Sequence, residues 1–114
     1  MIIIAGTIDM DPDQREDALE EARDLMGETR TQNGCHHYVW AADGFVPGRI
    51  YVFEEWAETD ALASHFANRY YKEMLALVGR YRPRRVEVKK YRVDHVEPVY
   101  DDKGVPRADF FTAD

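Results

Sequence analysis

The fold is decided by residues 35–56, CHHYVWAADGFVPGRIYVFEEW. Two runs rich in aromatic and β-branched residues, 35–42 and 49–56, flank a segment that contains two glycines and a proline. Aromatic and β-branched side chains favour strands, whereas glycine and proline between two such runs favour a reversal of the chain. The stretch therefore predicts a β-hairpin.

Both faces of this hairpin carry large apolar side chains. Because successive strand residues point to opposite faces, Tyr51 and Phe53 lie on the face opposite to Ile50, Val52 and Trp56. Helices on one side of the sheet cover only one of these faces. Self-association is the commonest way for a small domain to hide the other. We therefore expect a homodimer in which two sheets pack face to face.

The chain before the hairpin predicts a strand followed by a helix. Residues 2–8 are rich in β-branched side chains, which favour a strand. Asp11 followed by Pro12 is typical of an N-cap and a first helical residue, and the pair Asn33-Gly34 indicates the end of the helix. Between these signals the apolar residues recur at helical spacing.

The chain after the hairpin predicts a helical region and a last strand. Apolar residues between positions 61 and 78 recur at helical spacing, with a break at 68–69. In residues 86–93 the apolar positions change phase, which predicts a bulge near 89–90. The complete order, β-α-β-β-α-β, is that of a ferredoxin-like α+β fold, an antiparallel sheet with both helices on one face.

The composition narrows the class of protein. The 114 residues, 45% of them apolar, suffice for one domain with its own core. A formal net charge of -7 at pH 7 opposes binding to nucleic acid and to anionic membranes. The single Cys35 excludes an internal disulfide, and the first ten residues lack the basic segment of a signal peptide. We therefore expect a cytoplasmic domain over residues 1–95 with neither nucleic-acid nor membrane partners.

Residues 96–114 form a polar C-terminal tail that contains the adjacent aromatic residues Phe110 and Phe111 near its end. Two alternatives are open for this tail: it is disordered, or the two phenylalanines pack on the partner subunit. We expect the packed arrangement, because a free tail gains nothing from adjacent aromatic side chains.

Glu54, Trp56 and His65 are expected to converge. Glu54 and Trp56 are two positions apart on a strand, so they point to the same side, and the chain then runs directly into the helix that carries His65. A carboxylate beside an imidazole fixes its tautomer and raises its pKa, which makes a usable general base near neutral pH. The alternative is that His65 and Trp56 only pack in the core.

The chain resembles the antibiotic biosynthesis monooxygenase family over about residues 1–93. The most specific part of the resemblance is Glu54-x-Trp56 followed by His65, with Tyr71 beyond. The remaining matches are Ala5-Gly6-Thr7 in the first strand, Asn33-Gly34-Cys35, Pro47-Gly48, Ala61 and Leu62. This resemblance implies a small dimeric α+β barrel.

The resemblance also implies oxidation of a quinol, an anthrone or a similar polyphenolic aromatic by O2, without metal, flavin or haem. In such chemistry the deprotonated phenol passes one electron to O2, so the protein supplies only a base, a dry cavity and orientation. It implies that His65, held by Glu54, is the base. The residues implied to shape the substrate cavity are Trp56, Tyr38, Phe66, Tyr71 and Met74.

Other functions fit parts of the pattern. Related dimeric barrels degrade haem, but Met74, Leu75 and Leu77 occupy the helix positions where an axial histidine is expected, so the sequence disfavours this activity. No spacing typical of a metal site is present. The basic run at 80–92 is typical of a solvated strand face. A non-catalytic dimer that binds a small aromatic ligand or regulates a partner is the alternative that stays open.

Overall fold

The predicted hairpin forms half of the sheet in the computed structural model, which describes residues 1–111. β2 (Cys35–Ala42) and β3 (Arg49–Trp56) pair antiparallel, with the bounds that the sequence predicts. β1 (Ile2–Asp9) pairs with the other side of β3, and β4 (Arg85–Arg92) pairs with β1. The sheet order β2-β3-β1-β4 with antiparallel neighbours confirms the ferredoxin-like α+β fold.

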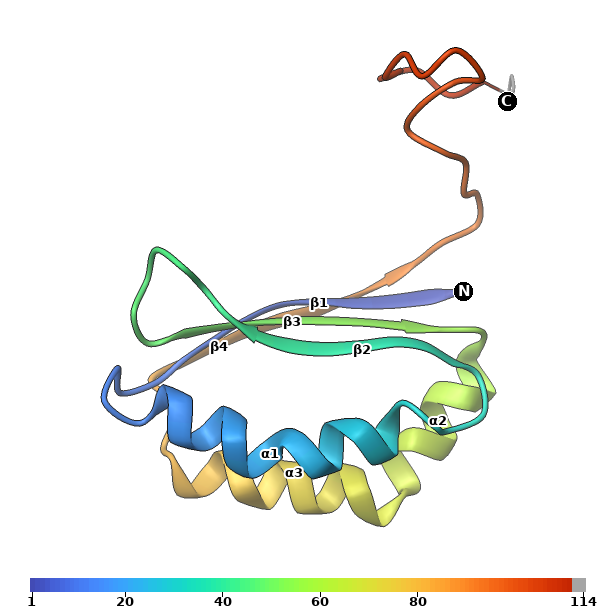
Figure 1. Cartoon of the computed structure of the whole chain (residues 1–114). Coiled ribbons are helices and arrows are strands. Elements are labelled where there is room, and N and C mark those ends of the chain that lie inside the picture. The colour runs from blue at the N-terminus through green and yellow to red at the C-terminus, as the bar shows by residue number, and fades with distance from the viewer. Residues whose placement is uncertain (112–114) are drawn as a thin grey trace.

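Three helices cover one face of the sheet (Figure 1). They are α1 (Arg15–Thr29), α2 (Thr59–Ala67) and α3 (Arg69–Arg80). Asn68 separates α2 from α3 with an extended backbone, and its Oδ1 accepts a hydrogen bond from the backbone N–H of Tyr70 at 2.9 Å. The predicted break at 68–69 is therefore confirmed, and an N-cap hydrogen bond starts the second segment.

Helix α1 begins later than the sequence predicts. Asp11 Oδ1 accepts a hydrogen bond from the backbone N–H of Asp13 at 2.9 Å, and the N–H of Gln14 donates to the Asp11 carbonyl at 3.0 Å. These bonds close a turn. The first helical residue is Arg15. The prediction of Asp11 as N-cap and Pro12 as first helical residue is wrong, because the Asp11 side chain serves the turn.

The predicted bulge near 89–90 is also wrong. β4 pairs with β1 residue by residue along its whole length. Val88 faces the helices and Tyr91 faces the other side, so apolar residues lie on both faces of a regular strand. The irregularity in the sheet lies instead in β2, between Cys35 and His37.

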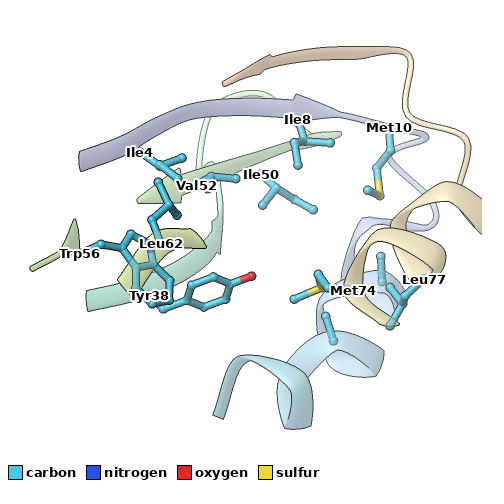
Figure 2. Packing of buried hydrophobic residues seen from close by; sticks show 12 residues of the cluster. Ile4, Ile8, Met10, Tyr38, Ile50, Val52, Trp56, Leu62, Met74 and Leu77 are labelled. Atoms are coloured by element: carbon cyan, nitrogen blue, oxygen red, sulfur yellow. The ribbon is translucent and has the colours of Figure 1, made fainter. Parts of the chain in front are cut away.

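The core lies between the sheet and the helices (Figure 2). Along β3, Ile50, Val52 and Trp56 are at most 3% exposed, whereas their neighbours Tyr51 and Phe53 are 49% and 39% exposed. The alternation predicted from the sequence is therefore confirmed. The other residues of the core cluster are Ile4, Ile8, Met10, Ala18, Ala22, Tyr38, Leu62, Met74 and Leu77.

The second face of the sheet, which we call the open face, is uncovered. It carries Val39, Tyr51, Phe53 and Tyr91, each at least 38% exposed. Within residues 1–111 no helix lies over this face, and the C-terminal tail leaves the domain on this side (Figure 1). The apolar character of both faces follows the sequence prediction, and the homodimer itself stays a prediction.

Gly6 in β1 pairs with Val88 in β4, and there is no room for a side chain at this position. A Cβ atom at this position would stand 2.1 Å from the carbonyl oxygen of Glu87 and 2.6 Å from Cα of Val88. Both neighbours are backbone atoms, so the strands would have to separate. We expect Gly6→Ala to lower the free energy of unfolding by roughly 3 kcal/mol in urea denaturation, at the upper end of the usual cost of overpacking.

Gly27→Ala in α1 is the matched control. A Cβ at Gly27 meets no atom within 4 Å, and alanine favours a helix over glycine by about 1 kcal/mol. This variant should be as stable as the wild type or more stable. A Gly6→Ala variant of unchanged stability would contradict the close approach of β1 and β4.

Candidate functional site

A cavity of about 500 Å³ lies between α3 and the sheet. Its walls are mainly apolar, and its polar groups are few. All four strands contribute to it: Tyr38 and Trp40 from β2, Val52 and Glu54 from β3, Ile4 and Ile8 from β1, and Val86, Val88, Lys89 and Lys90 from β4. The helices contribute His65, Phe66, Tyr71, Met74, Leu75 and Val78. An apolar cavity with a few converging polar groups is typical of a site for a small aromatic ligand.

One row of the sheet brings the polar groups of the cavity together. Tyr38 lies opposite Glu54, Glu54 lies opposite Ile4, and Ile4 lies opposite Lys90. Residues directly opposite each other on paired strands share a face, so these side chains all point toward the helices. The row places a hydroxyl and a carboxylate under α2 and an ammonium group at the β4 edge.

The carboxylate of Glu54 is buried beneath the helices. It is 6% exposed, and its Oε1 accepts a hydrogen bond from Nε1 of Trp56 at 3.0 Å. Burial raises the pKa of the Glu54 carboxyl above its ordinary value, although the hydrogen bond from Trp56 opposes this change. Glu54 is therefore a stronger proton acceptor than a solvated glutamate.

The imidazole of His65 is equally buried, at 2% exposure. Its Nδ1 lies 2.9 Å from Oε1 of Gln32. A carbonyl oxygen only accepts hydrogen bonds, so this contact favours the proton on Nδ1 and the lone pair on Nε2. Burial lowers the pKa of His65 from its ordinary value of 6.5 to about 4, which keeps the ring neutral at physiological pH.

The predicted coupling of Glu54 to His65 is wrong in two respects. Glu54 is hydrogen bonded to Trp56, whereas the hydrogen-bond partner of His65 is Gln32. The pKa of His65 is lowered and not raised, because the removal of water from around the ring has no opposing charge contact. The two groups share one cavity without a direct hydrogen bond.

Aromatic rings surround the imidazole of His65. The ring centroid of Trp56 lies 4.5 Å away, that of Tyr71 5.4 Å, that of Phe66 5.6 Å and that of Tyr38 5.8 Å. Trp56 is fully buried behind His65 and is not part of the cavity wall, whereas the other three rings line the cavity.

The structure therefore brings all the sequence-predicted site residues into one cluster. Tyr38 contributes a buried hydroxyl, and its burial raises the pKa of that group, so it stays protonated. Met74 is 3% exposed and lines the cavity from α3. The cluster thus combines two buried proton acceptors with flat aromatic walls.

Two residues of the site are absent from the sequence prediction. Gln32 lies in the turn between α1 and β2, where no periodic pattern marks it. Trp40 lines the cavity, and its position two residues after Tyr38 places it on the same face. Strand alternation alone was sufficient to find Trp40. Among residues 1–111, Gln32 Nε2 and Trp40 Nε1 are the buried side-chain atoms without a hydrogen-bond partner.

Within residues 1–111 no group of three or more His, Cys, Asp or Glu side chains is arranged to hold a metal ion. Over the same residues no helix has both the length and the apolar character needed to cross a membrane.

Comparison with known proteins assigns the chain to a family. The sequence pattern of the antibiotic biosynthesis monooxygenases matches residues 1–77. The chain belongs to this family. The matched region includes every candidate site residue.

Individual relatives support the same fold. An uncharacterized protein from Synechocystis is 26% identical over 92 residues, which is 81% of this chain and 63% of that protein. A structure from Deinococcus radiodurans named for the same family has a TM-score of 0.79 at 18% identity, covering 89% of this chain and 100% of the other. Rv0793 from Mycobacterium tuberculosis has a TM-score of 0.70 at 25% identity, covering 84% and 97%. This chain is thus similar in architecture to proteins of widely different sequence.

The buried neutral imidazole predicts acid sensitivity. In the unfolded chain His65 takes up a proton as the pH falls through about 6.5. In the folded protein the imidazole takes up this proton only as the pH falls through about 4. Stability should therefore be lost over this interval, by up to about 3 kcal/mol for the full difference in pKa. Urea unfolding at a series of pH values measures this loss.

The matched variant is His65→Gln, which has no titrating group at this position. The free energy of unfolding of the variant should change less than that of the wild type between pH 7 and pH 4, whatever its absolute value. Identical pH dependence in the two proteins would contradict a lowered pKa for His65.

Proposed function

We propose that this chain is a cofactor-independent monooxygenase that oxidises a quinol, an anthrone or a similar polyphenolic aromatic with O2. The observation that supports the proposal best is the cavity itself: aromatic walls enclose two buried proton acceptors, His65 and Glu54. Membership of the antibiotic biosynthesis monooxygenase family supports the monooxygenase part of the proposal.

The proposed reaction begins with removal of a phenolic or carbon-bound proton. His65 accepts this proton at Nε2, for which the structure records no hydrogen bond within residues 1–111. The substrate anion formed beside it stabilises the imidazolium, since an opposite charge in a cavity of low dielectric constant raises the pKa of the ring. Glu54, whose pKa is raised by burial, is the second acceptor in the same cavity.

The electrons come from the substrate anion. It passes one electron to O2, and the resulting organic radical and superoxide combine to a peroxide anion. The imidazolium of His65 returns its proton to this anion, which gives the hydroperoxide. Loss of water from the hydroperoxide leaves a new carbonyl group, so an anthrone CH2 and one O2 give C=O and one H2O. Removal of water from the cavity and orientation of the ring favour these steps.

The surrounding residues are proposed to shape the substrate site. Phe66, Tyr71 and Tyr38 supply aromatic surfaces, and Met74 supplies an adaptable apolar surface. Trp56 acts from behind, because its ring packs at 4.5 Å on His65 and its Nε1 holds Glu54. It is thus proposed to position both acceptors.

A non-catalytic aromatic-ligand-binding protein is the second candidate. The pKa of about 4 for His65 favours it, because a weak base contributes less to proton removal. The two candidates predict the same ligands and differ only in the consumption of oxygen.

Oxygen-electrode measurements separate the candidates. With protein freed of metals by a chelator, 1,8-dihydroxyanthrone and 1,4-naphthalenediol should be oxidised faster than in buffer alone. His65→Gln should lower kcat/KM by about 10²- to 10⁴-fold, the usual contribution of a general base. Ser64→Ala, at an exposed neighbouring position in α2, should leave it unchanged.

Two other outcomes would change the proposal. Equal rates in His65→Gln and the wild type would remove His65 as the base, and Glu54→Gln then tests the second acceptor. Binding of both aromatics, seen as quenched tryptophan fluorescence, without any oxygen consumption would favour the non-catalytic candidate.

We also propose that the open face packs against a second copy of the chain. Tyr51 and Phe53 at the centre of this face supply the apolar surface, and a two-fold arrangement covers both copies at once. The tail is proposed to take part. It forms an arm, residues 94–111, in which Tyr100 pairs with Pro106 and the backbone N–H of Arg107 donates to the Val99 carbonyl at 2.9 Å.

The arm leaves the domain on the side of the open face (Figure 1), which supports contact with the partner. The rest of the predicted tail, residues 112–114, lies outside the described residues. The exposed apolar side chains of the arm are Val96, Val99, Tyr100, Val105, Phe110 and Phe111.

Truncation after residue 95 tests this arrangement. Burial of each phenylalanine contributes about 1.5–3 kcal/mol, so the truncated chain should dimerise at least tenfold more weakly in sedimentation velocity. The double variant Phe110→Ser, Phe111→Ser should show the same loss. Phe45→Ser, at a 95% exposed hairpin position, is the control. Unchanged dimerisation of the truncated chain would exclude a contribution of the arm to the interface. A monomeric wild type would exclude the proposed dimer.

A further inference from the structure

Gln32 makes the single side-chain hydrogen bond that the structure shows for His65. Its Oε1 lies 2.9 Å from Nδ1, across a sequence separation of 33 residues. The four aromatic neighbours of the imidazole contact it through their rings and leave its two nitrogens otherwise unbonded among the described residues. Among the described residues, this contact is therefore the one side-chain hydrogen bond that can select between the two tautomers of the ring.

The backbone of the α1–β2 turn holds Gln32 against α2. Gly34 has a φ of 81°, and a Cβ at that position would stand 2.5 Å from Cβ of Ala61. The N–H of Ala57 donates to the Gly34 carbonyl at 2.8 Å, and the N–H of Cys35 donates to the Gln32 carbonyl at 3.1 Å. The turn is thus bonded to the segment that precedes α2, and the Gln32 side chain reaches His65 from this turn.

We propose that Gln32 is a positioning residue that fixes His65 in the Nδ1–H tautomer, so that Nε2 is the nitrogen available as a proton acceptor. The catalytic consequence rests on the proposed monooxygenase function, whereas the tautomer is a property of the protein alone. When Nε2 accepts a proton, the Nδ1–H···O bond becomes charge-assisted and stabilises the imidazolium.

The unsatisfied amide of Gln32 supports a role beyond packing. Its Nε2 is buried without a hydrogen-bond partner, and a buried donor left unpaired costs about 1–3 kcal/mol. An aliphatic side chain in the turn would avoid this cost. A specific acceptor role for the carbonyl oxygen would account for a glutamine at this position.

The titratable groups around His65 come from three elements. Tyr38 and Glu54 come from the sheet and Tyr71 comes from α3, and all three line the cavity. The loss of hydration on burial accounts for the lowered pKa of His65 without a charge contribution from these groups. A carboxylate introduced at position 32 would therefore be the first charge in direct contact with the ring.

Long-range ¹H–¹⁵N correlation spectra of the free protein test the tautomer directly. His65 is assigned by the signal that disappears in His65→Gln. The wild type should show a protonated Nδ1 and an unprotonated Nε2 near pH 7. A wild-type spectrum with Nε2 protonated would overturn the proposal, because the amide of Gln32 would then donate to Nδ1.

Two substitutions at Gln32 separate positioning from packing. Gln32→Leu removes the acceptor at similar volume, and the spectrum should change toward a mixture of tautomers. Gln32→Glu keeps an acceptor oxygen and adds a charge, so the Nδ1–H form should persist and the pKa of His65 should rise. An unchanged spectrum in Gln32→Leu would overturn the proposal.

Activity provides a second readout. With 1,8-dihydroxyanthrone, Gln32→Leu should lower kcat at least about tenfold, in line with other histidines that lose their orienting partner, and Gln32→Glu should restore most of it. The other glutamine of the chain, Gln14, is exposed, so Gln14→Leu is the control. It should leave both the spectrum of His65 and kcat unchanged. If no aromatic is oxidised, the proposed function fails, and the spectra still decide the role of Gln32.

Discussion

The packing of Trp56 against His65 and Glu54 is the interaction on which the rest of the site depends. Trp56 is the last residue of β3 and is fully buried, and α2 begins only three positions later. Its ring contacts the imidazole, and its Nε1 satisfies one oxygen of the carboxylate. One apolar residue with one polar atom thus joins the sheet to the helix layer and supports both buried ionisable groups.

The two ionisable groups respond to the same environment in opposite directions. Burial disfavours charge, so it raises the pKa of Glu54 and lowers that of His65. Neither change stabilises the charged form of the group. A domain selected only for stability would place apolar residues at these positions. The presence of two costly groups in one cavity is what physically distinguishes this region from an ordinary core.

The cavity and the open face follow from the same two-layer architecture. The helices lie on one side of the sheet (Figure 1). The cavity lies between residues of α2 and α3 and a floor formed by all four strands. The strands also carry apolar residues on their second side, which leaves Tyr51 and Phe53 exposed in the single chain. Alternate residues of the same strands thus form two surfaces. Those that face the helices line the candidate site, and those on the open face form the proposed surface for association.

The sequence by itself determined the elements and the cluster of candidate residues. The two aromatic and β-branched runs around a glycine- and proline-containing segment predicted the bounds of β2 and β3. The position of Glu54 and Trp56 on one face, with the helix directly after them, predicted that Glu54 and His65 lie close together. Only the tertiary structure decided which group bonds to His65 and in which direction its pKa moves. Periodicity reports which way a side chain points, whereas a hydrogen-bond partner such as Gln32 and the loss of hydration depend on distant segments that cover the group. The regular pairing of β4 has the same origin, since the local signal for a bulge gave way to pairing with β1 along the whole strand. The turn at Asp11 is instead local, because its side-chain hydrogen bond reaches only two residues along the chain, and the residue types alone did not distinguish this turn from a helix cap.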